Sequence, residues 1–481
     1  MRRTRIKAAG AGHYHCMSRI IERRHVLGEI EKERLLEASE HALVTMNAHL
    51  FWTMEEVGGI LSVWHDERQH MSEKAAVGMA SSQDRPGQGE SVFAQAARIF
   101  DGWTDSDTGT RVLRVNPPGV DMFPGHFATP YHQTQPFLDG GRRVLLRQST
   151  NRERARDSTA RSVLLNLATG ALDDLFPSDC YVVDMNDREQ IAIIARHGDS
   201  HRIVIRDLRE GRDLADLEPD EGWTGGGAIL LADGRRAAVS HFQGKPYDEH
   251  CRTHFHLLSP GEEARVFLEL EGIYGNHLMA CPTDPDLFSY NAWPTPRWDI
   301  DGVTSIASVD GKRNGYIPLD GAAPRPGNFW GVRDHYVWTP DGKRIVSYLN
   351  CQPLDISRPF NHFTFDWWLS ALDWRSGEDY CARYPAGRWG GHMQVTPDSM
   401  FILCGGGPGF DKLFAVDLQA LKCGWNEHVI CSYPATVAGG LNSDPFPYPF
   451  ALPDGSGVIF NAGWPGPEHG VYLAEWPSGL R

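Results

Sequence analysis

The stretch "TPDGKRIVSY" (residues 339–348) decides the fold, because its pattern recurs along most of the chain. Its Asp341-Gly342 pair is followed by residues that alternate between polar and apolar. An Asp-Gly pair suits the positive φ of a tight hairpin, and the alternation predicts a strand that buries one face. Related stretches on both sides each place an acidic residue in the turn: Asp139, Asp187, Asp233, Asp284, Asp341, Asp398 and Asp454.

The spacing of these turn acids indicates the architecture. Successive turns are 48, 46, 51, 57, 57 and 56 residues apart. A near-constant period of about 50 residues is typical of β-propellers, whose blades are four-stranded sheets. One blade cannot cover both of its faces, so seven blades close into a ring. The sequence therefore predicts an all-β, seven-bladed propeller, and we expect residues 103–118 to add a strand to the last blade and fasten the ring.

The residues before the repeats have a different character. We expect residues 1–65 to form an N-terminal extension that is partly helical and partly disordered. Residues 66–92 are rich in Ser, Gly, Gln and charge, which predicts a linker. The propeller is expected over residues 93–481.

Composition indicates which cellular compartment and which classes of partner to expect. The N-terminus has no apolar signal-peptide segment, no run of 18 apolar residues predicts a membrane span, and the nine cysteines lie singly. We therefore expect a cytoplasmic protein with reduced thiols and no membrane partner. A net charge of −15 argues against nucleic acid as a partner, because phosphate binding needs a basic face. It leaves room for a local arginine cluster. The oligomeric state is not predicted.

Three histidines stand out in the segments that should line the central channel. His277, His335 and His392 precede the turn acids of three consecutive blades by seven, six and six residues. A single histidine in such a place is usually a structural residue that is hydrogen-bonded to a neighbour. Three histidines at one register give a functional role the same weight as a structural one, because histidine is a natural general base near neutral pH and a common metal ligand.

The order of motifs from about residue 103 to 477 resembles that of oligogalacturonate lyases, a family of seven-bladed enzymes that degrade pectin. The motifs that carry the resemblance are "WTDSDTGTRVLRVNPPGV" (103–120), "GNHLMACPTDPDLFSYNAWP" (275–294), "RDHYVWTPDGKRIVSY" (333–348) and "HGVYLAEWP" (469–477). The resemblance implies β-elimination on an anionic oligosaccharide with the help of a divalent, manganese-like cation.

Residue by residue, the resemblance implies that His277 is the base and His335 a metal ligand. Candidates for substrate binding are Arg252, His254, Arg333, Arg388, His392, Gln394, Trp330 and Tyr448. The family completes its metal site with a Gln and two His from the last blade. Ser443, Phe446 and Tyr448 stand at those positions here. Phe cannot ligate a metal, so the family's metal site is not expected in that form. His335, His392 and Gln394 could form a relocated site.

Two further interpretations stay open. The changed positions in the last blade favour a non-catalytic propeller that binds a carbohydrate or a protein. Residues 1–42 resemble the first strand and helix of REP-associated tyrosine transposases, through "GHYHCMSRIIERRHVLGEIEKE" (12–33). That family also needs a His-hydrophobic-His motif and a catalytic Tyr soon afterwards, and neither follows. His254-Phe255-His256 has the right letters but lies some two hundred residues too far along.

Overall fold

The computed structural model describes residues 90–481 except for 117–125, 132, 150–160, 174, 178–179, 197–201, 246–249, 295–302, 317–330, 352–365, 386–391, 406–410, 434–446, 463–469 and 481. The extension, most of the linker and the transposase-like motif lie outside these residues. Across the described part, no helix is long and apolar enough to cross a membrane.

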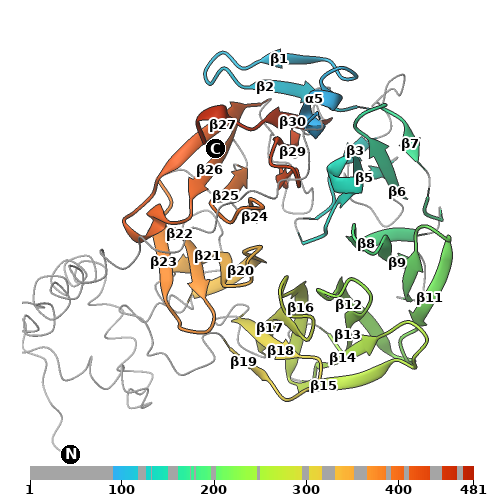
Figure 1. Cartoon of the computed structure of the whole chain (residues 1–481). Helices are drawn as coiled ribbons and strands as arrows, with labels where there is room; N and C mark the ends of the chain where they lie inside the picture. Colours follow the sequence, from blue (N-terminus) through green and yellow to red (C-terminus); the bar gives the residue numbers. More distant parts are fainter. Residues whose placement is uncertain are drawn as a thin grey trace, which may run out of the picture. The chain divides into compact units, whose positions relative to one another are not determined.

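Seven antiparallel sheets surround a central channel, which confirms the predicted seven-bladed propeller (Figure 1). The first three blades are formed by β3 (His126–Ala128), β4 (Phe137–Leu138), β5 (Arg143–Ser149), β6 (Arg161–Asn166) and β7 (Leu172–Asp173); by β8 (Cys180–Asn186), β9 (Ile191–Arg196), β10 (Ile203–Asp207) and β11 (Arg212–Leu217); and by β12 (Trp223–Leu230), β13 (Ala237–Gln243), β14 (Arg252–Leu258) and β15 (Arg265–Glu271).

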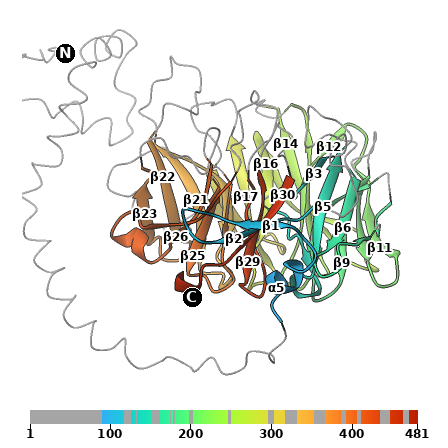
Figure 2. The ribbon, with the colours of Figure 1, turned by 90° about the horizontal axis from the view of Figure 1, so that it is seen from above.

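The remaining blades repeat the same order from the inner to the outer strand (Figure 1), and Figure 2 shows the ring of blades from its edge. They are formed by β16 (Ile273–Ala280), β17 (Leu287–Pro294), β18 (Val303–Ser308) and β19 (Asn314–Tyr316); by β20 (Gly331–Trp338), β21 (Arg344–Cys351), β22 (Asp366–Asp373) and β23 (Asp379–Arg383); by β24 (Met393–Val395), β25 (Phe401–Gly405), β26 (Lys412–Asp417) and β27 (Glu427–Ser432); and by β28 (Phe450–Ala451), β29 (Gly457–Ala462), β30 (Gly470–Glu475), β2 (Arg111–Arg114) and β1 (Gly102–Thr104).

The repeated turn is held by its acidic residue. In the fifth blade the Asp341 carboxylate accepts hydrogen bonds from the Thr339 hydroxyl at 2.6 Å and the Lys343 amide at 3.1 Å. Asp398 receives the same two bonds from Thr396 and Met400 in the sixth blade. Gly342 has a φ of 67°, a conformation that glycine adopts without steric penalty. Local chemistry therefore accounts for the period seen in the sequence.

The N-terminal segment closes the ring, as the sequence predicted. β2 pairs with β30, with Leu113 opposite Leu473, and it completes the last blade. β1 adds a fifth strand outside β2. The short helix α5 (Val92–Ala96) fastens the same blade, because the Val92 amide donates to the Asp454 carboxylate at 2.8 Å.

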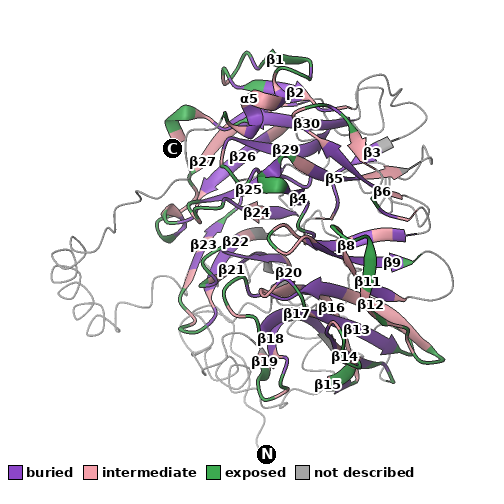
Figure 3. Ribbon diagram, turned by 45° about the vertical axis from the view of Figure 1, so that its right-hand side comes forward, coloured by how far each residue is buried: buried purple, intermediate pink, exposed green. Residues whose placement is uncertain are grey.

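The hydrophobic core lies between successive blades and is not one central mass (Figure 3). One cluster joins Leu145 and Leu164 of the first blade to Val182 and Ile194 of the second. Burial of such surfaces is the main stabilising term in folding, at about 25 cal/mol per Å² of apolar surface. Each sheet depends on its neighbours, so the ring holds the inner strands in place around the channel.

Candidate functional site

Five aromatic rings meet where the inner strands line the channel. The rings of His277, His335 and His392 follow one another, with centroids 5.4 Å and 4.3 Å apart, and Tyr448 continues the row at 4.5 Å from His392. Tyr131 lies against all four, at centroid distances between 5.4 and 6.1 Å. We call these five side chains the ring cluster.

The repeat explains how four members of the ring cluster come together. His335, His392 and Tyr448 each lie six residues before a turn acid, and His277 lies seven before its own. The same place in four consecutive blades therefore faces the channel. The structure thus brings together the three histidines that the sequence singled out. Tyr131 belongs to the segment between β3 and β4 in the first blade, and it is the member that sequence reasoning did not single out.

Two of the histidines occupy strained backbone. His277 and His335 have φ values of 51° and 50°, in the left-handed region that non-glycine residues seldom adopt. Both lie at interruptions of strand pairing, between Asn276 and Met279 in β16 and between Asp334 and Val337 in β20. Such bulges turn a side chain away from its regular direction and occur often beside active sites. Tyr448, with a φ of 40°, shares the conformation.

Hydrogen bonds from other blades hold the backbone at His277. Its carbonyl oxygen accepts from the Gln133 side chain, with Nε2 3.2 Å away, and from the Tyr336 hydroxyl. Gln133 comes from the first blade and the fully buried Tyr336 from the fifth. Left-handed backbone costs about 1 to 3 kcal/mol at a non-glycine residue and persists only where its surroundings fix it. These two donors provide such fixation.

A short chain of polar side chains reaches Nδ1 of His277, and the orientation of its amide decides which ring nitrogen carries the proton. Asn291 Nδ2 lies 3.3 Å from His277 Nδ1, and Asn291 Oδ1 lies 3.5 Å from the Thr304 hydroxyl. In this orientation the amide donates to Nδ1, so the neutral ring is protonated at Nε2. Rotating the amide by half a turn places Oδ1 opposite Nδ1 and reverses the tautomer. The Thr304 hydroxyl donates or accepts, so it suits both orientations.

His335 has a phenol as its partner. Its Nδ1 lies 2.6 Å from the hydroxyl of Tyr348, and the two rings stack with centroids 5.3 Å apart. Tyr348 is buried on β21, next to the strand that carries the histidine. When this hydroxyl donates to Nδ1, the neutral imidazole presents an N–H at Nε2.

The ring cluster has an exposed part and a buried part. Tyr131, His277 and His335 are partly exposed, whereas His392 and Tyr448 are only 6% and 1% exposed. The first three are therefore partly open to solvent. The last two support them from behind, and Tyr448 also belongs to the core between the last blade and the first.

The segment that carries Tyr131 is tied down by a buried carboxylate. Asp184 of β8 accepts a hydrogen bond from the Gln135 amide at 2.9 Å and another from the Leu230 amide at 2.9 Å, which joins the first three blades. The Thr134 hydroxyl adds a bond to the carbonyl of Val183 at 2.9 Å. Burial raises the pKa of Asp184 to about 7, although the amide donors oppose this effect.

The residues described here do not fit a manganese site. Two of the contacts of His335 are with rings: His392 meets it edge to face, and the Tyr348 hydroxyl lies 2.6 Å from its Nδ1. Manganese favours oxygen ligands such as carboxylates. In the described part of the chain, no three His, Cys, Asp or Glu side chains are placed to hold a metal ion. Ser443 and Phe446 lie outside that part.

The other predicted site residues do not belong to the ring cluster. Arg252 and His254 lie on β14, the third strand of its blade. Arg252 pairs with Glu271 at 3.4 Å, and His254 stacks on Trp223 with ring centroids 4.0 Å apart. Gln394 is half-buried on β24, two residues after His392. The backbone of Arg333 belongs to β20, but its side chain lies outside the described residues, as do Trp330 and Arg388.

Comparison with known proteins supports the fold. No protein-family model matches the sequence, and no curated protein matches it either. Among solved structures, an oligogalacturonate lyase in complex with manganese aligns with a TM-score of 0.60 at 17% identity, over 79% of this chain and 97% of its own. The oligogalacturonate lyase of Vibrio parahaemolyticus aligns with the same score at 15% identity, over 79% and 98%. At such identities the likeness establishes the shared propeller alone.

Proposed function

We propose that the ring cluster is the active site of a lyase that cleaves uronic-acid oligosaccharides, of the oligogalacturonate type, by β-elimination. The observation that carries the proposal is the meeting of three histidines from consecutive blades beside Tyr131. The strained backbone at His277 and His335 supports it, because such strain is concentrated at functional sites. The shared fold of two oligogalacturonate lyases is consistent with the same class of substrate.

The reaction makes three demands on the protein. A base removes the proton from C5, the carbon next to the carboxylate, and the electron pair forms the double bond between C4 and C5. The bond from C4 to the bridging oxygen breaks, and that oxygen leaves with a proton. The site must therefore supply a base, an acid and hydrogen-bond donors for the carboxylate, where negative charge accumulates.

His277 is the proposed base. It is partly exposed, and its ring is held by the buried Asn291 and Thr304. To accept a proton at Nε2, the ring needs the Asn291 amide rotated by half a turn from the orientation described above, so that Oδ1 faces Nδ1, and the Thr304 hydroxyl suits that orientation as well. Asn291 is thus a positioning residue that sets the proton on the ring without touching the substrate.

His335 and Tyr131 are the proposed donors. His335, held by Tyr348, presents an N–H at Nε2 to the substrate carboxylate. Tyr131 places a phenol beside both histidines, and its proposed role is to donate a proton to the leaving oxygen. Arg333 and Arg388 stay as proposed partners of the carboxylate, because an arginine binds such a group through two parallel hydrogen bonds. No divalent cation is included, since the donor set described above does not fit one.

A cytoplasmic location is part of the same proposal. Seven cysteines whose side chains are described are thiols that belong to no disulfide, which supports a reducing environment. Four of the buried ones are Cys180, Cys251, Cys281 and Cys404. A cytoplasmic enzyme would receive short oligosaccharides after larger polymers had been cut elsewhere.

Burial within the ring cluster favours a second candidate function, which is binding without turnover. Tyr448 and His392 are packed as core residues are, and Tyr448 stands where the family resemblance implies a metal ligand. A propeller of this kind would recognise an oligosaccharide through the partly exposed rings and leave it intact. Calorimetry that detected uronide affinity without product would favour this alternative.

The test is an assay on a panel of oligogalacturonides and other uronides, followed by the ultraviolet absorbance of the unsaturated product. The wild type should produce that signal, and His277→Ala should lose it by at least about a hundredfold. His428→Ala is the matched control, because His428 lies on the outer strand β27 and contacts Phe401. No product on the whole panel, or full activity in His277→Ala, would reject the proposal.

A further inference from the structure

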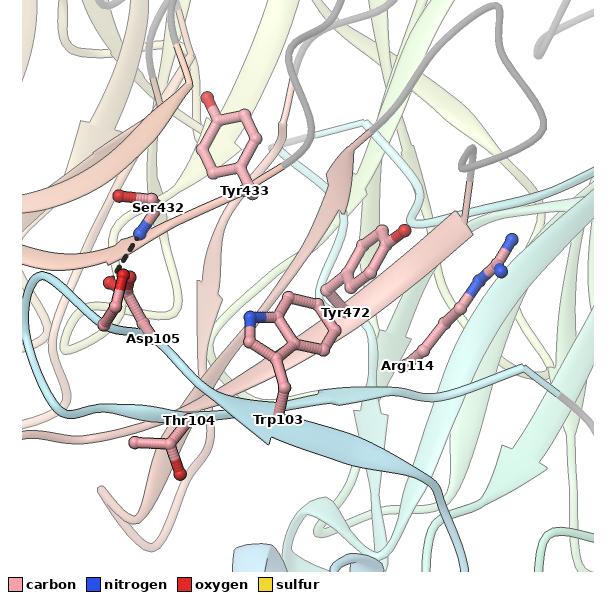
Figure 4. A pocket seen from close by; sticks show the side chains of 8 residues that line it. Trp103, Thr104, Asp105, Arg114, Ser432, Tyr433 and Tyr472 are labelled. Atoms are coloured by element: carbon pink, nitrogen blue, oxygen red, sulfur yellow. Dashed lines mark hydrogen bonds between the residues drawn. The ribbon is translucent and has the colours of Figure 1, made fainter.

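A second candidate site lies at the seam where the ring closes, on the outer side of the last blade. A cavity of about 570 Å³ opens there, between the β1–β2 hairpin, β30 and the end of β27 (Figure 4). Six of its lining residues carry the argument below: Trp103, Asp105, Arg114, Ser432, Tyr433 and Tyr472. Of these, Trp103 is exposed, Arg114 and Ser432 are partly exposed, and Asp105, Tyr433 and Tyr472 are buried.

One wall of the cavity is built by Asp105, which links the hairpin to the sixth blade. Its carboxylate accepts hydrogen bonds from the Ser432 amide at 3.0 Å, the Thr108 hydroxyl at 2.7 Å and the Asp107 amide at 3.2 Å. Burial by itself would raise the pKa of Asp105, but these bonds outweigh it and hold that pKa below its ordinary value. Asp105 is therefore charged, fully engaged and fixed, so the shape of the wall is fixed as well.

Trp103 supplies a rigid aromatic surface. Its side chain belongs to the outermost strand of the blade and is 40% exposed. Its ring meets Tyr472 edge to face, with centroids 5.8 Å apart and an angle of 80°. An aromatic ring that is held in place yet open to solvent is well suited to an amphipathic ligand, because its face offers a large apolar contact at little entropic cost.

Arg114 supplies a cation on the other side of Trp103 from Asp105 (Figure 4). It is partly exposed on β2, and Gly470 opposite leaves room for it, since a Cβ there would lie 3.2 Å from Arg114 Nε. A guanidinium recognises a carboxylate through two parallel hydrogen bonds. In a chain with a net charge of −15, a cation in this cavity favours an anionic ligand.

We propose that this cavity is a second carbohydrate-binding site, which takes one uronic-acid residue of an oligosaccharide. The apolar face of the sugar ring stacks on Trp103, and its carboxylate pairs with Arg114. The Ser432 hydroxyl, which is buried and has no hydrogen-bond partner among the described residues, offers a further polar contact in the same cavity. The choice of a uronide rests on the proposed function, whereas the site itself does not, because it lies outside the channel.

The experiment is a calorimetric titration of trigalacturonate into the His277→Ala variant, in which turnover is blocked and the cavity is unchanged. Two binding events are expected, one in the channel and one at the seam. Adding Arg114→Met or Trp103→Ala should remove the second event or weaken it at least tenfold, and Trp103→Phe should weaken it less. Arg313→Met is the matched control, because Arg313 lines a cavity of about 560 Å³ near β18 that has no exposed tryptophan among its lining residues.

Each result is decisive for one site or the other. Binding that persists unchanged in Arg114→Met and in Trp103→Ala overturns the inference, as does equal affinity for the methyl-esterified trisaccharide, which lacks the charge. Seam binding in a protein that never produces unsaturated sugar would reject the proposed lyase function and leave the second site standing. Circular dichroism on each variant shows whether the propeller is intact, and Trp103→Phe reports on stacking even if Trp103→Ala is unfolded.

Discussion

His335 and His392 come from neighbouring blades and meet edge to face, with their ring centroids 4.3 Å apart and their planes inclined by 78°. In this contact the rings pack against each other. Two imidazoles that ligate one ion instead direct a nitrogen each at a common point. Tyr448 packs behind them at 4.5 Å from His392. The row is thus held together by contacts between rings, and its fourth member is a tyrosine at the register where the other three blades carry a histidine.

The first prediction concerns Tyr448→His, which places a fourth imidazole in the row. Because Tyr448 occupies the same register as the histidines and imidazole suits zinc, this variant should bind Zn²⁺ at least tenfold more tightly than the wild type. Calorimetry measures the affinity, and the double variant with His335→Ala should lose the gain. Stoichiometric, tight Mn²⁺ binding by the wild type would contradict the conclusion that its donor set does not fit the metal.

The second prediction concerns the partner of His277. Asn291→Leu removes the group that orients the ring, so kcat should fall about ten- to a hundredfold with little change in KM. Asn291→Asp keeps an acceptor opposite Nδ1 and adds negative charge, which favours the protonated ring. The acid limb of the pH–rate profile should therefore move to higher pH by about one unit. A purely structural role for Asn291 predicts no such movement in Asn291→Asp.

Most of the architecture could be predicted from the sequence because its determinants are local. In five of the seven turns the acid accepts a hydrogen bond from the amide two residues later, as Asp341 does from Lys343, so the period is visible in the sequence. The histidine register follows from the same repeat. The pairing of β2 with β30 could be predicted as well, because a ring needs a closing strand.

The parts that could not be predicted depend on contacts across the ring. Tyr131 lies on a segment that connects two strands, and its ring meets His277 only in the folded protein. The spacing of residues along the sequence therefore does not reveal this contact. The left-handed backbone at His277 and His335 arises from interrupted pairing with the neighbouring strand. Asp184 resembles the turn acid Asp187 three residues later. Only the assembled blades show that Asp184 is 4% exposed and holds two amides from other blades.

The third prediction follows from the buried carboxylate of Asp184. Its pKa is about 7 in the folded protein, against an ordinary value near 3.8, so between these values the folded state binds more protons than the unfolded state. This contribution to stability is fully present below about pH 4 and is lost as the pH rises through 7, at no more than about 1.4 kcal/mol per pH unit. Asp184→Asn lacks this titration.

Denaturant unfolding of the wild type and of Asp184→Asn across pH 4 to 8 measures the effect. The difference between their free energies of unfolding should shrink as the pH rises, because all other groups titrate alike in both proteins. Asp207→Asn is the control, since that carboxylate is partly exposed and its pKa is lowered. A difference that is constant with pH, or that grows with it, would show that Asp184 stays charged in the folded protein.

The fourth prediction compares two turn glycines that share a φ of 67° but differ in their surroundings. At Gly455 no atom lies within 4 Å of an added Cβ, so Gly455→Ala should cost only the left-handed strain, about 1 kcal/mol. At Gly342 the added Cβ would meet Thr283 Oγ1 of the preceding blade at 2.1 Å. Gly342→Ala should therefore cost about 1 to 3 kcal/mol more, and Thr283→Ala should recover part of that excess in a double-mutant cycle. Chemical denaturation measures the loss in the free energy of unfolding for each variant. Equal losses at the two glycines would contradict the prediction, because they would mean that neighbouring blades move apart easily enough to accommodate the added methyl group.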